Sequence, residues 1–349
     1  MLLESRPYFP GVDLAKIIAM FLVLVSHVNS YGIEVCDDRL SLVHTLIKSV
    51  SCSCVDLFVL ATGYLCCQSR CKYSRLVNLW LATVFWGVCV LLFCDGVLGK
   101  AVPFSSYIKA VFPVFTDQYW FFTAYFMVFQ FMPLLNKGIN SLDKREFISL
   151  FIVTGVFLGV YSRLGEGDMF CLRRGFSWAW LVVVYIIGGY MRIHGVVKLK
   201  PLYCFMIALL MAFLACGHMF VATLMGVKTP GGRFIAYISP FTLGVAVLLF
   251  SGCLNLSYGQ RIARFLKFVS ATTFGVYLIH VQPYFWQHVW QDTLRLIKVN
   301  TAFELIVVVV VCASCYFVLF ALLECIRQFG FKKLGIDGIG DRIDQVLKR

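Results

Sequence analysis

Long apolar runs, separated by short polar segments, dominate the pattern of this sequence. The runs lie at residues 11–30, 43–67, 76–94, 119–136, 147–161, 177–192, 202–222, 234–250, 269–287 and 303–325. A helix rises about 1.5 Å per residue, so a run of roughly 20 residues crosses about 30 Å of hydrocarbon. The runs are continuous, whereas the strands of a β-barrel alternate apolar and polar residues. The pattern predicts an all-α, polytopic transmembrane helical bundle of about ten helices.

The composition supports a bilayer environment. Hydrophobic residues make up 60% of the chain and charged residues 14%, with a mean hydropathy of +0.83. Soluble domains are about 45–50% apolar and about 25% charged, because their surfaces face water. The net charge of +13 does not indicate nucleic-acid binding, because the basic residues are spread through the loops between the apolar runs. The chain is therefore expected to have membrane lipids and no nucleic acid among its partners.

The distribution of basic residues predicts the orientation. With the N-terminus placed in the cytoplasm, most of the 31 lysine and arginine residues fall on the cytoplasmic side, as the positive-inside rule requires. Both termini are then cytoplasmic. We expect residues 1–349 to form a single membrane domain with a polar cytoplasmic tail at about 330–349. The first run lacks a small-residue cleavage site, so it is interpreted as a retained helix.

The 15 cysteines show no framework of spacings. Most lie inside apolar runs, where a cysteine behaves as a small hydrophobic residue. Cys52, Cys54, Cys66 and Cys67 lack the later His or Cys partners of a zinc site. No metal and no structural disulfide are expected.

Four ionisable residues are predicted at membrane depth, where a charge is costly and usually functional. Lys16 and His27 are eleven residues apart in the first run, which puts them on one helix face about 16 Å apart. Asp56 lies well inside the second run and needs a cation or hydrogen-bond donors. His280 lies part way along the ninth run, at about the depth of Asp56.

Each of these residues has a purely structural alternative. Lys16 could extend to the inner interface while His27 caps the outer one. Asp56 could pair with Lys16, orient His27, or serve only as an ion pair that fixes helix packing. His280 could simply make a hydrogen bond between helices.

A basic loop with Arg70, Lys72 and Arg75 follows the second run. Guanidinium and ammonium groups bind phosphates, so the loop is a candidate site for a phosphorylated donor, with ordinary positive-inside topology as the alternative. Tyr119 and Trp120 begin the fourth run. They belong either to an aromatic belt at the outer surface or to a sugar-stacking site.

Taken together, these segments resemble the acyltransferase 3 family of bacterial membrane acyltransferases. The first helix has the family's basic residue, ten intervening residues and a histidine, as Lys16 to His27, although the family usually has arginine first. The second helix has an acidic residue followed by Phe-x-x-x-Ser-Gly-Tyr-Leu, with threonine here in place of serine, from Asp56 to Leu65. Further matches are the basic stretch Arg70 to Arg75, Trp120-Phe121 with Pro133-Leu-Leu-Asn136, and Ser270 to His280.

The resemblance implies an O-acyltransferase that uses acyl-CoA, most simply acetyl-CoA, as a donor co-substrate without a permanently bound cofactor. The acceptor is implied to be a hydroxyl of a surface or lipid-linked carbohydrate, and the location the bacterial inner membrane. His27 is implied as the catalytic residue, either as general base or through an acyl-histidine.

The other roles follow from this assignment. Asp56 would orient or balance His27, and Lys16 would face the donor or stabilise the oxyanion. Arg70, Lys72 and Arg75 would hold the CoA phosphates, and Trp120, Tyr277 and His280 would bind substrate. The rival class is a transporter or flippase of glycan precursors, which inverted repeats with broken helices would indicate. No such pair of repeats is evident in the sequence.

Overall fold

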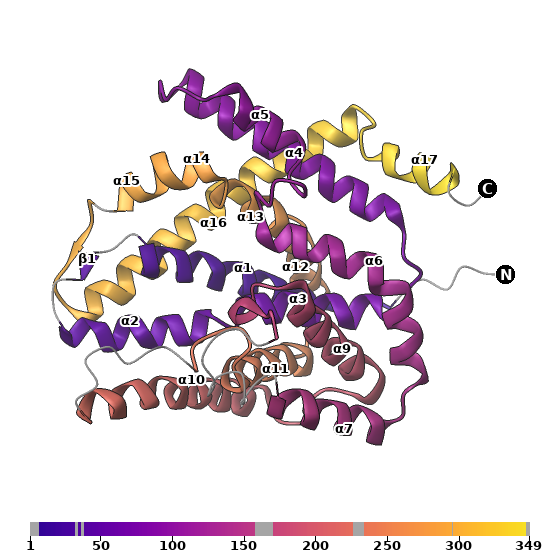
Figure 1. The fold of residues 1–349 in the computed structure, drawn as a ribbon, viewed down its shortest axis with the longest axis vertical. Coiled ribbons are helices and arrows are strands. Elements are labelled where there is room, and N and C mark those ends of the chain that lie inside the picture. Colours follow the sequence, from indigo (N-terminus) through magenta and orange to yellow (C-terminus); the bar gives the residue numbers. More distant parts are fainter. Residues whose placement is uncertain are drawn as a thin grey trace.

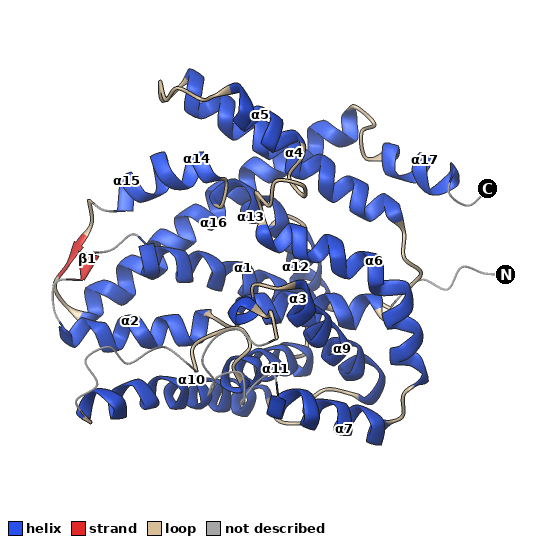
Figure 2. Cartoon of the chain, in the orientation of Figure 1, coloured by secondary structure: helices blue, strands red, loops and turns tan. Residues whose placement is uncertain are grey.

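The computed structural model describes residues 7–31, 34–35, 38–157, 170–225, 234–294 and 296–346, and these form a helical bundle (Figures 1 and 2). The longer helices are α1 (Pro10–Tyr31), α2 (Asp38–Ser51), α3 (Cys54–Cys66), α4 (Tyr73–Gly96), α6 (Trp120–Ser141), α7 (Lys144–Thr154), α9 (Trp178–His194), α10 (Pro201–Leu224), α11 (Pro240–Asn255), α12 (Gln260–Ser270) and α16 (Ala302–Lys333). Shorter elements are α5 (Phe104–Val111), η2 (Arg173–Gly175), α13 (Thr273–His280), α14 (Pro283–Phe285), η3 (Trp286–Trp290), α15 (Gln291–Leu294) and α17 (Gly338–Val346). Two short strands, β1 (Glu34–Val35) and β2 (Lys298–Val299), pair in parallel.

The expectation of a helical membrane bundle is confirmed. Six helical segments of the described chain are long and apolar enough to cross a bilayer: Pro10–Ser30, Leu40–Cys66, Tyr73–Gly96, Pro201–Val221, Gln260–His280 and Ala302–Lys333. Two shorter apolar helices, Trp178–His194 and Pro240–Asn255, match the sixth and eighth predicted runs. The fifth run, 147–161, extends beyond the described part of its segment. A total of about ten spans and the side of each terminus stay predictions.

Helix α1 lies at the centre of the bundle. It contacts α2, α3, α11, α12, α13 and α16, and its residues Ala15, Ala19, Met20 and Leu24 are fully buried. Small side chains on this surface allow close packing. Because α1 is surrounded by other helices, its polar side chains face those helices.

Two of the predicted apolar runs each divide into two helices in the structure. The second run divides between α2 and α3, where the hydroxyls of Ser51 and Ser53 donate to the carbonyls of Lys48 and Val50. Hydroxyls bonded to the preceding turn bend a helix. The ninth run was predicted at 269–287. In the structure its segment begins earlier, with α12, and continues as α13, which ends at His280.

Pro283 explains where α13 ends. A proline lacks the N–H that a helix interior needs and drives the residue before it toward extended geometry. Gln282 has that geometry, and its Oε1 accepts from the N–H groups of Tyr284 and Phe285 to begin α14. His280 therefore sits at the last position of a helix, beside a turn.

A buried ion pair supports α13 from behind. Glu324 on α16 accepts from Arg327 at 2.6 and 2.9 Å and from the indole N–H of Trp86 on α4 at 2.7 Å. Gly275 of α13 packs directly on the Glu324 carboxylate, where a β-carbon would overlap it. These contacts tie α4, α13 and α16 together and fix the position of α13.

The α3–α9 contact depends on glycines that let the two backbones touch. A β-carbon on Gly63 would overlap the carbonyl oxygen of Tyr185, and one on Gly188 would overlap that of Leu60. Backbone carbonyls move only with their helices, so the two helices would have to separate.

We therefore expect Gly63→Ala to lower the free energy of unfolding by about 1–3 kcal/mol, as overpacking does. Gly138→Ala is the control, because a β-carbon there meets open space. Thermal unfolding of the two variants in detergent checks this, and equal melting temperatures would contradict the close α3–α9 contact.

Candidate active site

The bundle encloses a cavity of about 380 Å³ that runs along α1. Four side chains of α1 line it: Lys16, Val23, Ser26 and His27. Lys16 and His27 are eleven residues apart, so the cavity has two ends separated by about 16 Å along the helix axis. The predicted common face of Lys16 and His27 is thus present in the structure.

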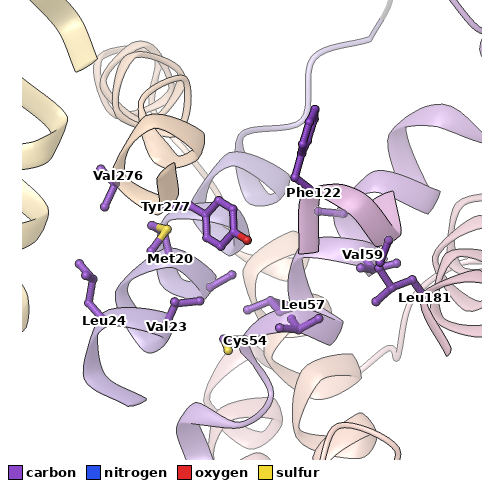
Figure 3. Packing of buried hydrophobic residues seen from close by; sticks show 14 of the residues in the cluster. Met20, Val23, Leu24, Cys54, Leu57, Val59, Phe122, Leu181, Val276 and Tyr277 are labelled. Atoms are coloured by element: carbon purple, nitrogen blue, oxygen red, sulfur yellow. The ribbon is translucent and has the colours of Figure 1, made fainter. Parts of the chain in front are cut away.

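Figure 3 shows the packing of buried hydrophobic residues, of which Val23, Cys54 and Tyr277 also line the cavity. Met20, Val23 and Leu24 come from α1, Cys54 and Leu57 from α3, Phe122 from α6, and Val276 and Tyr277 from α13. Apolar side chains such as Val23, Val55 and Phe58 form part of the cavity wall, which suits the chain of a long molecule.

The first end of the cavity is built around Lys16. Its Nζ lies 3.4 Å from Asp13 Oδ1, which also accepts from the hydroxyl of Ser270 at 2.6 Å. Asp13 is 8% exposed and joins α1 to the end of α12. Lys16 pairs with Asp13 here, and this arrangement holds its charge at the cavity wall.

The second end of the cavity is built around His27. The Nε2 atom of His280 lies 3.2 Å from His27 Nδ1, and His280 Nδ1 lies 2.8 Å from the carbonyl oxygen of Val276. His280 is fully buried, and the ring of Trp286 packs edge-on against His27 at 4.9 Å. The structure therefore brings the two predicted histidines into contact.

The two hydrogen bonds define the tautomers of a neutral pair. A carbonyl only accepts, so the proton of His280 lies on Nδ1, and its Nε2 is an acceptor. His27 must then donate from Nδ1, which leaves the lone pair of His27 on Nε2. A histidine held in this tautomer is oriented to take a proton at Nε2.

A cluster of aromatic rings forms part of the cavity wall, with Trp120 and Tyr237 among the lining residues. Trp120 and Tyr237 stack at 6.0 Å with an interplanar angle of 18°, and Phe176 lies 4.7 Å from Trp120. Gln118, beside them, has a buried Oε1 without a hydrogen-bond partner among the described residues. The predicted substrate residue Trp120 thus lies in a ring cluster next to an acceptor atom.

Asp56 has a different setting from the one considered in the sequence. Its Oδ1 accepts from the indole N–H of Trp180 on α9 at 2.9 Å, and its Oδ2 has no hydrogen-bond partner within the described chain. Its neighbours Cys54, Val55 and Phe58 line the cavity, whereas Asp56 faces α9. The contact the structure gives Asp56 joins α3 to α9.

The basic loop lies beyond the Lys16 end. Arg75 donates to the Sγ of Cys66 at 3.7 Å. Thr62 and Leu79, one turn from Cys66 and Arg75 on their respective helices, both line the cavity. Arg70, Lys72 and Arg75 are exposed, so they form a charged surface next to this end.

Asn136 and Asn140 on α6 hold the start of this loop. Asn136 Nδ2 donates to the carbonyls of Cys66 and Ser69, and Asn140 Nδ2 donates to that of Cys67. The last carbonyls of a helix lack partners within the helix, and that of Cys66 also accepts from the N–H and the hydroxyl of Ser69. Tyr185 donates to Asn136 Oδ1 at 2.6 Å and fixes its orientation.

Several residues of this region are not predicted from the sequence, among them Asp13, Gln118, Trp180 and Tyr237. Asp13 gives a signal, because an acid three residues before Lys16 shares its helix face. Trp180 and Tyr237 give none, because the residues they contact, Asp56 and Trp120, are far away in the sequence.

The comparison with protein families fits this geometry. A family model described as an acyltransferase domain, that of the acyltransferase 3 family, matches residues 9–323. The chain belongs to this family, which supports membrane acyltransferase activity. No curated protein matches the chain, and no solved structure matches it.

The setting of Asp56 yields a stability prediction. Asp56→Leu leaves the indole N–H of Trp180 buried without an acceptor, which we expect to cost about 1–3 kcal/mol of unfolding free energy. Asp56→Asn keeps an acceptor oxygen and should unfold near the wild-type temperature. The measurement is thermal unfolding in detergent alongside acyl transfer. If Asp56→Asn is as stable as wild type but inactive, Asp56 has a chemical role beyond this contact.

Proposed function

We propose that this protein transfers an acyl group, most simply acetyl, from acyl-CoA to a hydroxyl of a cell-surface or lipid-linked carbohydrate at the bacterial inner membrane. The observation that carries the proposal is a single cavity with Lys16 at one end and an oriented His27 at the other. Such a cavity suits a long donor that enters at one side and reacts at the other.

The donor enters from the basic surface. The phosphates of CoA bind the exposed Arg70, Lys72 and Arg75. Its pantetheine arm then passes Lys16 and lies along the apolar wall, which places the thioester near His27. This assignment gives Lys16 a role in binding the donor.

His27 acts as general base at Nε2. It takes the proton of the acceptor hydroxyl while the hydroxyl oxygen attacks the thioester carbonyl carbon, and the carbonyl π electrons move to oxygen. When that intermediate collapses, the carbonyl re-forms, the C–S bond breaks, and the CoA sulfur takes the proton from His27. His280 accepts the Nδ1–H of His27 throughout, which keeps the ring oriented.

The acceptor binds at the aromatic end. Sugar faces stack on rings such as Trp120 and Tyr237, and a sugar hydroxyl can donate to the buried Oε1 of Gln118. Gln118, Trp120 and Tyr237 line the same cavity as His27. They support a carbohydrate acceptor over a fully apolar one.

The test is release of free CoA from acetyl-CoA by purified protein with a crude glycan extract as acceptor. We expect wild type to release CoA and His27→Ala to be slower by about 10²-fold or more, the usual contribution of a general base. His280→Gln keeps an acceptor for His27 and should retain more activity than His280→Leu. His194→Ala is the control, since its ring packs on Phe147 and Tyr190 away from the cavity.

Activities are interpreted only for variants that melt at the wild-type temperature, so that a loss of activity does not reflect unfolding. Equal release by wild type and His27→Ala would remove His27 from the chemistry. No release by wild type with several acyl-CoA donors and acceptors would refute the proposed reaction and favour the transport class.

A further inference from the structure

Two tyrosine hydroxyls on the cavity wall lack hydrogen-bond partners among the described residues. Tyr119 is 1% exposed and Tyr277 is 9% exposed, and their ring centroids are 6.2 Å apart. Buried hydroxyls are nearly always paired, because an unpaired one loses its hydrogen bonds to water. Two such groups on one cavity indicate that a bound molecule supplies their partner.

The surroundings of these hydroxyls favour a negatively polarised oxygen as that partner. Tyr119 is the N-terminal flanking residue of α6, and no side chain caps this helix. The first N–H groups of a helix lack internal partners and form its positive end. Figure 3 shows the Tyr277 hydroxyl directed from α13 toward α6. A hydroxyl without a partner in this position can donate to a ligand held at the end of α6.

The pair also lies at the reacting end of the cavity. Tyr277 is one turn before His280 on α13, with their ring centroids 6.1 Å apart, and His280 bonds His27. Lys16 lies about 16 Å from His27 along α1. A lysine side chain cannot cover that distance, so Lys16 cannot contact a carbonyl attacked beside His27.

We propose that the hydroxyls of Tyr119 and Tyr277, at the N-terminal end of α6, bind the carbonyl oxygen of the acyl group and stabilise the oxyanion formed there. This inference rests on the proposed acyl transfer and names its oxyanion-stabilising residues. As the acceptor oxygen bonds to the carbonyl carbon, negative charge grows on the carbonyl oxygen, and both hydroxyls donate hydrogen bonds to it. No proton leaves either tyrosine, and the bonds weaken again when the carbonyl re-forms and the C–S bond breaks.

The kinetic test uses Tyr119→Phe, Tyr277→Phe and the double variant. Each change removes one oxygen and keeps the ring, so packing is preserved. Loss of one donor to an oxyanion lowers kcat by about 10²–10³-fold in a well-studied protease, and we expect at least a tenfold loss here with the KM for acetyl-CoA little changed. Tyr190→Phe is the matched control, because Tyr190 packs against Phe147 and Phe151 outside the cavity.

A binding experiment measures the contribution of the carbonyl oxygen to affinity in the absence of reaction. The probes are two unreactive thioethers, S-acetonyl-CoA and S-isobutyl-CoA, which differ by a carbonyl oxygen in place of a methyl group. Wild type should bind the acetonyl compound more tightly, and this preference should disappear in the double variant while affinity for the isobutyl compound is unchanged.

The outcomes separate this inference from the proposed function. The oxyanion assignment is overturned if Tyr119→Phe and Tyr277→Phe keep the wild-type kcat. It is also overturned if wild type binds both thioethers with equal affinity. Either result leaves the proposed acyl transfer intact. A raised KM for the glycan with unchanged kcat also overturns it, because the hydroxyls then bind the acceptor. If wild type binds neither thioether and releases no CoA, the proposed donor itself is wrong.

Discussion

The hydrogen bond between His27 and His280 is the interaction on which this site depends. It requires that α1 lies at the centre of the bundle and that α13 ends beside it. Pro283 ends α13 there, and the Glu324–Arg327 pair fixes the position of α13. The carbonyl of Val276 then fixes the proton of His280, which in turn fixes that of His27. A backbone atom of one helix thus determines which nitrogen of another helix carries the lone pair.

The cavity joins two chemically different ends. At one end the wall carries Lys16, and the exposed Arg75 contacts Cys66, one turn from the cavity-lining Thr62, which suits the phosphates of a donor. Near His27 it carries a base, stacked rings and unpaired hydroxyls, which suit a sugar hydroxyl and an acyl carbonyl. Polar groups at bilayer depth are costly. Here Lys16 and His27 lie eleven residues apart on α1, and apolar residues such as Val23 and Phe58 also line the cavity.

The sequence predicts the helical class well, because apolar runs long enough to span a bilayer are a direct signal of it. It also predicts that Lys16 and His27 share a face, since helical periodicity fixes this. The Gln282-Pro283 pair inside the run 269–287 was a readable signal that α13 ends early. Other features were not readable. The contact of Asp56 with Trp180 and that of His27 with His280 join residues 124 and 253 positions apart, so only the folded helices bring them together.

The most direct test of a single cavity that joins the basic surface to His27 is the sidedness of transfer. The protein is placed in sealed vesicles with the loop containing Arg70 and Lys72 facing outward. Membrane-impermeant acetyl-CoA is added outside and a glycan acceptor is trapped inside. The account predicts acetylated glycan in the vesicle interior, formed by wild type and not by His27→Ala. Acetylation that occurs only when donor and acceptor share the outer compartment would contradict it.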